Sequence, residues 1–383
     1  MTRNAARTVA SFTLCAAALA LGGPAAAQFP SVTLPFSGDN QKSPVSQTLG
    51  LVRVSVDYSS PDVHAPDGTD RRGKIWGELV PYGMVNLGFG TCGDQCPWRG
   101  GANENTVFTT SHAIKVQGQP LPAGSYGLHF IPGADEWTVI FSKNHTSWGS
   151  YFYDAKEDAL RVQVKPEKSA YSEWLTYEFT DRRPDKATLA LRWDELQVPV
   201  QLSVDNLADL YIANMRQELR SSPGFTWTNW NAAAQYALAN KTNLPEAERW
   251  AEQAVNAGFG GQANFTTLST LAQLQVANGK GAEAAKTMDQ ALNHPSAGPI
   301  DIHQYGRLLQ TQKTNEEAMK VFELNAKRHP NQWPVEVGLA RGHLGLGRKA
   351  EALEHARKAL PQAPTGPARQ GVEALIQEIE SAK

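Results

Sequence analysis

The residues best suited to ligand chemistry lie in one glycine-rich segment that begins at Trp98 and ends at Glu104. Arg99 can hold a carboxylate or a phosphate through two parallel hydrogen bonds, and Glu104 can act as a base or accept a hydrogen bond. Loops often display such residues. We therefore predict four ligand-binding residues in this segment: Trp98, Arg99, Asn103 and Glu104. A structural alternative stays open, in which Arg99 pairs with Glu104 to hold a turn and Asn103 adopts a left-handed conformation.

The part of the chain ahead of residue 205 also contains four histidines: His64, His112, His129 and His145. Three of them would have to converge in space to bind a metal ion, with Glu104, Asp62 or Asp94 completing the ligand set. No two of them have a ligand spacing such as H-x-x-x-H. We therefore predict no metal ligands and no cofactor. We keep His112 and His129 as further candidates for ligand binding.

Cys92 and Cys96 enclose three residues in a C-x3-C loop. In an exported chain such an even pair is first interpreted as a disulfide bond. A thioredoxin-like redox motif would have two intervening residues, and a soft-metal site would need both thiolates. We predict a disulfide that clamps this loop. A metal- or redox-handling role for the two cysteines, together with the histidines, stays open as an alternative.

No familiar catalytic motif accompanies these residues. The sequence lacks a G-x-S-x-G elbow, an H-E-x-x-H pair, a Walker loop and a dinucleotide fingerprint. Its formal net charge is −2 and it contains no basic block, so the electrostatic footprint of a nucleic-acid-binding protein is missing. These absences favour a protein without enzymatic activity. The enzymatic alternative is a hydrolase-like site around Arg99, Asn103 and Glu104.

The N-terminus has the pattern of a cleaved signal peptide. Arg3 and Arg7 supply positive charge, Val9–Leu21 is almost wholly apolar, and the small residues Ala25–Ala27 follow. This order is typical of a secretory signal. We predict that residues 1–27 are removed and that the mature protein is periplasmic or secreted. No later stretch approaches about 18 continuous apolar residues, so we predict no integral membrane segment in the mature chain.

Between about residues 47 and 205, apolar residues alternate with polar ones. Val52, Val54 and Val56 are each followed by a polar residue, and residues 160–164 and 196–204 show the same pattern. Strict alternation indicates strands with one buried face, and clusters of glycine and proline mark short turns between them. We predict an antiparallel β-sandwich or barrel-like domain over residues 47–205, preceded by an extended segment over 28–46.

The same part of the chain contains an ordered series of short motifs: KIWG (74–77), LVPYG (79–83), WRGGANE (98–104), LPAG (121–124), IPG (131–133), EWTVIF (136–141) and WG (148–149). Together they resemble the DUF2911 family over roughly residues 45–205. The resemblance implies an exported bacterial domain that is rich in β-structure, is often followed by helical repeats and has no established activity. In that family the PYG motif runs almost directly into the WRxGANE motif, whereas here residues 86–97 are inserted and carry both cysteines.

After residue 205 the apolar residues recur at intervals of three and four, and a 34-residue repeat appears. Two sets of small residues share this interval: Ala284, Ala318 and Ala352, and twelve positions earlier Ala272, Gly306 and Ala340. This period is the signature of tetratricopeptide (TPR) repeats, whose stacked helical hairpins share one core. We predict a helical linker over residues 206–224 and an all-α, TPR-like solenoid over 225–383, with four hairpins and a capping helix.

These inferences describe a multidomain β + α protein. We predict that it is an exported, non-catalytic binding or assembly protein. The groove of the helical repeats would dock a protein or peptide, as stacked repeats commonly do. The β domain would bind a second partner or a small ligand.

Overall fold

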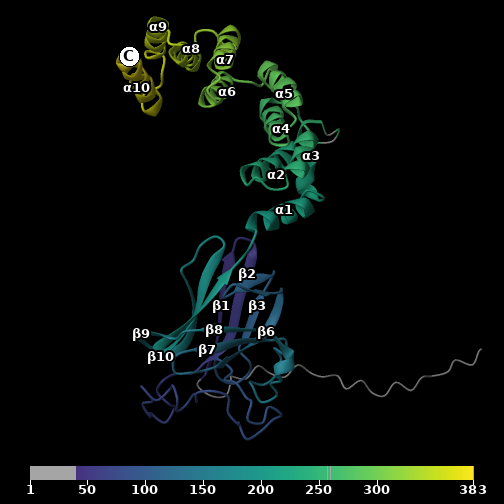
Figure 1. Cartoon of the computed structure of the whole chain (residues 1–383), viewed down its shortest axis with the longest axis vertical. Helices are drawn as coiled ribbons and strands as arrows, with labels where there is room; N and C mark the ends of the chain where they lie inside the picture. The colour runs from purple at the N-terminus through teal and green to yellow at the C-terminus, as the bar shows by residue number, and fades with distance from the viewer. Residues whose placement is uncertain (1–39, 257, 259, 383) are drawn as a thin grey trace, which may run out of the picture.

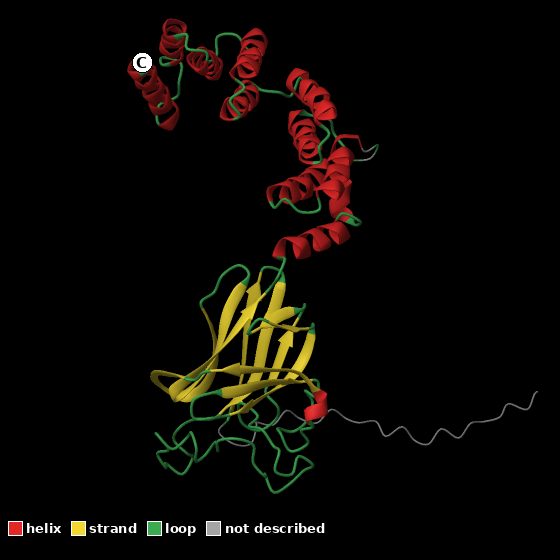
Figure 2. Cartoon of the chain, in the orientation of Figure 1, coloured by secondary structure: helices red, strands yellow, loops and turns green. Residues whose placement is uncertain are grey.

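The computed structural model describes residues 40–256, 258 and 260–382. The predicted signal peptide lies outside the described residues. The described chain forms two parts, a β domain and a curved array of helices, which are joined end to end (Figure 1). Figure 2 shows that the long strands belong to the first part and the long helices to the second.

The β domain consists of two sheets. The six-stranded sheet has the order β1 (Gln41–Leu49), β2 (Val52–Ser60), β3 (Val107–Thr110), β6 (Gly124–Ile131), β7 (Trp137–Ser142) and β8 (Asp158–Val164). The four-stranded sheet has the order β5 (Gln119–Leu121), β4 (Ile114–Val116), β10 (Lys186–Ser203) and β9 (Glu167–Thr180). Neighbouring strands in both sheets are antiparallel. A short 3-10 helix, Ala155–Glu157, precedes β8.

The core of the β domain lies between the inner faces of the two sheets. Val52, Val54 and Val56 of β2 are fully buried in one cluster with Leu189 and Val198 of β10. Their polar neighbours along β2 point away from this core, as the alternating pattern predicts. The predicted antiparallel sandwich is therefore confirmed.

A long connection, residues 61–106, covers one end of the sandwich (Figure 1). It is anchored by a cluster of tryptophans around Trp76. The ring of Trp76 lies 5.0 Å from that of Trp137 on β7 and 5.7 Å from those of Trp98 and Trp193. Edge-to-face packing of this kind adds to the stabilisation from burial. The connection is thus fixed to the strands although its backbone is irregular.

The second part is built of helices: α1 (Leu207–Glu218), α2 (Trp227–Ala239), α3 (Leu244–Asn256), α4 (Phe265–Ala277), α5 (Gly281–Asn293), α6 (Pro299–Thr311), α7 (Asn315–Arg328), α8 (Trp333–Gly345), α9 (Lys349–Ala359) and α10 (Pro367–Ser381), with a 3-10 turn at Ser222–Phe225. Helices α2 to α9 form four successive hairpins, and α10 packs against α9. No helix within the described ranges combines the length and the apolar character that a membrane span requires.

The small residues of the 34-residue repeat lie where paired helices touch. Ala284, Ala318 and Ala352 are each at most 3% exposed. A Cβ added at Gly306 would lie 2.3 Å from the ring of Phe322, so only glycine leaves room for the ring there. The predicted TPR-like solenoid is confirmed.

Helix α1 belongs to both hydrophobic cores. Leu207 and Leu210 pack against the core of the β domain. Ile212 and Leu219 belong to the first core of the helical array. The close approach of Leu207 to Gly50, whose φ is +58°, leaves no space for a side chain at that glycine. The two parts of the molecule are therefore connected through packed side chains as well as through the backbone.

Candidate functional site

A hollow of about 370 Å³ opens at the end of the β-sandwich that the 61–106 connection covers. We call it the sandwich-end hollow. Its polar lining comes from Arg71, Arg99, Asn40 and Asn103. Its remaining walls are mostly apolar and aromatic: Leu79, Val80, Pro81, Val85, Leu87, Pro97, Trp98 and Trp193. Three of the predicted ligand-binding residues, Trp98, Arg99 and Asn103, thus line one cavity.

Arg99 is held in place by neutral groups. Its Nη1 donates a hydrogen bond to the carbonyl oxygen of Asn103 at 2.5 Å, and its Cζ lies 5.2 Å from the centre of the Tyr151 ring. A side chain at Gly149 would collide with the guanidinium. Within the described part of the chain, Arg99 pairs with no carboxylate. Its positive charge is therefore available to a ligand.

Glu104 does not pair with Arg99. The Nζ of Lys42 on β1 lies 2.5 Å from the Glu104 carboxylate, and this hydrogen bond lowers the pKa of Glu104. Asn103 does adopt the left-handed conformation, with φ at 59°. The suggested Arg99–Glu104 pair is therefore wrong, because the first strand brings Lys42 closer. The left-handed turn is correct.

Arg71 reaches the hollow from the opposite side of the 61–106 connection. Its Nε donates to the carbonyl of Val63 at 2.9 Å, and its Nη2 donates to the carbonyl of Asp62 at 2.9 Å. The Asp62 carboxylate is 3.5 Å from Nη2. Two backbone acceptors hold the guanidinium in one orientation, and its charge is offset by the Asp62 carboxylate and, more weakly, by Asp67.

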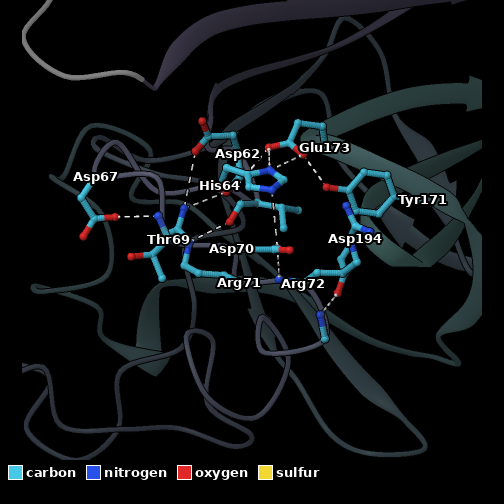
Figure 3. A network of polar contacts seen from close by, with 12 residues as sticks. Asp62, His64, Asp67, Thr69, Asp70, Arg71, Arg72, Tyr171, Glu173 and Asp194 are labelled. Carbon is cyan, nitrogen blue, oxygen red and sulfur yellow. Dashed lines mark hydrogen bonds and ion pairs between the residues drawn. The ribbon is translucent and has the colours of Figure 1, made fainter.

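The loop that carries Arg71 is tied to the smaller sheet at two points (Figure 3). Nδ1 of His64 lies 3.0 Å from the Glu173 carboxylate on β9. The backbone N–H of Gly73 donates to Oδ2 of Asp194 on β10 at 2.9 Å. Asp194 is almost fully buried. These contacts restrict the movement of the loop and so position Arg71.

Glu173 keeps its charge over a wide pH range. Burial acts in the opposite direction, but hydrogen bonds from Tyr171 and His64 lower the pKa of Glu173 to about 2. The carboxylate therefore remains an acceptor for the His64 loop at any pH near neutrality.

His129 lies beneath the loops rather than in the sandwich-end hollow. It is 2% exposed, and its Nδ1 lies 2.9 Å from the hydroxyl of Ser150. Burial, and then the nearby charge of Arg99, lower the pKa of His129 to about 4. The ring is therefore neutral at pH 7 and does not line the hollow.

The other histidines are dispersed. His112 lies in the turn between β3 and β4 beside Ser111, at the end of β3 remote from Glu104. His64 belongs to the Arg71 loop, and His145 lies in the loop that follows β7. The described residues contain no cluster of three or more metal-ligating side chains. Of the residues that a hydrolase-like site was to gather, only Arg99 and Asn103 line the hollow.

The two cysteines form the predicted disulfide. Cys92 and Cys96 are bonded and pack with Ile140 of β7 and Tyr153. Neither sulfur is then a thiolate that could bind a metal. The bond closes the inserted loop against the larger sheet, next to Leu87, which lines the sandwich-end hollow.

Replacing both cysteines with serine is expected to lower the free energy of unfolding of the β domain by about 2 kcal/mol, because the disulfide closes a loop of only about five residues. Urea unfolding of the Cys92→Ser/Cys96→Ser variant would measure the change. A thiol assay on the mature chain should find free thiols only after reduction. Two reactive thiols in the untreated protein would contradict the disulfide.

The helical array has its own hollow, of about 480 Å³, between α4, α5 and α6. We call it the helical groove. Val276 and Leu308, which line it, are 64% and 43% exposed. Tyr305, Met288 and Ala284 complete a largely apolar surface. Helices α4 and α6 lie on the inner side of the arc (Figure 1).

The comparisons with known proteins match the β domain and the helical array to different groups of proteins. The family model described as "Protein of unknown function (DUF2911)" matches residues 40–202. This range includes β1 to β9 and nearly all of β10. Residues 40–202 match DUF2911. The DUF2911 segment contains all residues that line the sandwich-end hollow. No curated protein matches the sequence.

Solved structures of TPR proteins resemble this chain weakly. A thermophilic TPR protein of Thermus thermophilus is 16% identical, with a TM-score of 0.32, over 46% of this chain and 92% of that one. YrrB, titled a TPR protein with an unusual peptide-binding site, is 17% identical, with a TM-score of 0.30, over 44% and 84%. PcrH from Pseudomonas aeruginosa is 20% identical, with a TM-score of 0.25, over 30% and 92%.

The sequence alone does not identify Arg71 and Trp193 as parts of the sandwich-end hollow. Arg71 lies in a run of charged residues that reads as a solvated loop, and Trp193 lies within a long strand. No local spacing connects either residue with Arg99. The contact between the 61–106 connection and β10 brings them together, and only a folded chain reveals it.

Proposed function

We propose that this protein is an exported docking protein, in which the helical groove binds an apolar segment of a partner protein or peptide and the DUF2911 domain binds a small ligand. The observation that supports docking most directly is the pair Val276 and Leu308. Two large apolar side chains are exposed side by side around one hollow. Exposed apolar surface of this kind marks sites of interaction.

The groove also has a polar neighbour along α6. A further hollow, of about 280 Å³, is lined by Arg307 and Gln310 of α6, by Arg341 of α8 and by Glu378, so that two arginines face one glutamate. Burial, and then the charge of Arg307, lower the pKa of Arg341. Glu378 of α10 lies 3.8 Å from Arg341 and is largely exposed. This crowding of positive charge favours a partner segment that carries an acidic group beside its apolar anchor.

Selection of peptides from a random display library on the mature chain would test the docking function. The expected binders carry an apolar residue, and Leu308→Asp should weaken their binding at least about tenfold, because a buried carboxylate would face an apolar side chain. Ile300→Asp is the matched control. Ile300 is on the same helix and 51% exposed, but it does not line the groove.

Two results would contradict this function. One is that no peptide is enriched over a column without protein. The other is that the selected peptides bind Leu308→Asp and Ile300→Asp equally well. Circular dichroism of both variants at 222 nm would show whether the helical array is intact.

A further inference from the structure

The lining of the sandwich-end hollow carries positive charge without a matching carboxylate. Arg71 and Arg99 line it, and none of the acidic residues in the described part of the chain does. Glu104 binds Lys42, and Asp62 pairs with Arg71 at 3.5 Å, so Arg99 is the guanidinium that has no carboxylate partner among the described residues. A partly buried guanidinium without a counter-ion favours an anion in the hollow.

Residues that line the hollow carry N–H groups without an acceptor among the described residues. Trp193 lines it and is 2% exposed, and its indole Nε1 has no hydrogen-bond partner among the described residues. Toward the described residues, Arg99 donates a side-chain hydrogen bond through Nη1 alone. A ligand that accepts hydrogen bonds would satisfy groups that the fold leaves unpaired.

The other walls require an apolar body in the ligand. Leu79 is 46% exposed at the hollow, and Val85, Leu87 and the ring of Trp98 lie around it. An inorganic anion would leave this surface in contact with water. The volume of about 370 Å³ is at the lower end of the range for small-molecule sites.

We propose that the sandwich-end hollow binds a small organic carboxylate, whose carboxylate faces Arg71 and Arg99 and whose apolar body lies against Trp98 and Leu79. This inference rests on the part of the proposed function that gives the DUF2911 domain a small ligand. It is independent of peptide docking by the helical groove, so either can fail without the other.

The fold holds the cationic groups ready before a ligand arrives. Two backbone carbonyls orient Arg71, and contacts to Glu173 and Asp194 fix its loop (Figure 3). The left-handed turn at Asn103 holds Arg99. Binding then requires little ordering of side chains, which preserves affinity.

The test is calorimetric titration of the mature chain with phenylacetate, 3-phenylpropionate and indole-3-acetate, each beside its uncharged amide. At least one carboxylate should bind with a dissociation constant below about 1 mM. Its amide should bind about ten- to a hundredfold more weakly, because it loses the charge-assisted hydrogen bonds. Inorganic phosphate, titrated alone, should bind more weakly than the carboxylate.

Arg99→Gln should weaken binding of the carboxylate about ten- to a hundredfold and leave binding of the amide nearly unchanged. Arg53→Gln is the matched control, because Arg53 is exposed on β2 outside the hollow. If circular dichroism shows that Arg99→Gln is unfolded, Arg71→Gln replaces it. Should both be unfolded, the comparison of carboxylate with amide on the unaltered chain decides.

Three results would overturn the inference. None of the carboxylates binds, each amide binds as tightly as its acid, or phosphate binds more tightly than every carboxylate. A carboxylate that binds Arg99→Gln and Arg53→Gln equally well would also place the anion elsewhere.

Discussion

Replacing Phe322 with alanine is expected to lower the free energy of unfolding of the helical array by about 3–5 kcal/mol. The ring is fully buried. It lies against the backbone at Gly306, Gly338 and Gly342, where an added Cβ would come within 2.3, 2.7 and 3.0 Å of it. Three glycines from α6 and α8 thus form a slot for one aromatic ring. Alanine would leave a cavity that the helices cannot close.

Urea unfolding followed at 222 nm would measure this loss. Ile300→Ala is the control, because Ile300 lies on α6 and is 51% exposed, and its truncation should change the stability by less than about 1 kcal/mol. Equal effects of the two substitutions would show that the slot does not carry the packing of the last two hairpins.

Acidification from pH 7 to pH 4 is expected to cost the β domain about 3 kcal/mol through His129 alone. The folded chain binds a proton on this ring only near pH 4, whereas an ordinary histidine does so at 6.5. Between these values the unfolded chain holds more protons. The contribution of neutral His129 is therefore complete above about pH 6.5 and is lost as the pH falls towards 4.

The His129→Gln variant isolates this contribution. The variant should lose about 3 kcal/mol less than the unaltered chain over the same pH interval, as measured by urea midpoints at several pH values. His112→Gln, in the turn between β3 and β4, should follow the unaltered chain. If the free energies of unfolding of His129→Gln and the unaltered chain fall in parallel between pH 7 and pH 4, the pKa of His129 is not lowered in the folded chain.

The repeat and the strands could be predicted because their signals are local and periodic. Ala284, Ala318 and Ala352 recur at one interval, and each is buried at a helix contact. The valines of β2 alternate with polar residues and fill the sandwich core. In both parts the buried positions recur at a fixed interval along the chain, so the pattern can be seen in the sequence itself.

The candidate site was only partly predictable because it is assembled from remote segments. Trp98, Arg99 and Asn103 belong to one motif and do line one hollow. Lys42, which pairs with Glu104 in place of Arg99, is 62 positions from Glu104 in the sequence. Arg71 and Trp193 are 122 positions apart in the numbering of the chain. Their proximity depends on how the 61–106 connection packs against two strands, and residue types alone do not encode that packing.

Helix α1 joins both cores, and the 61–106 connection that lines the sandwich-end hollow covers the end of the β domain remote from α1 (Figure 1). Under the proposed function, a chain with both sites occupied is a bivalent adaptor. Such an adaptor bridges its two cargoes best at intermediate abundance, since an excess of the adaptor loads each cargo on a separate copy.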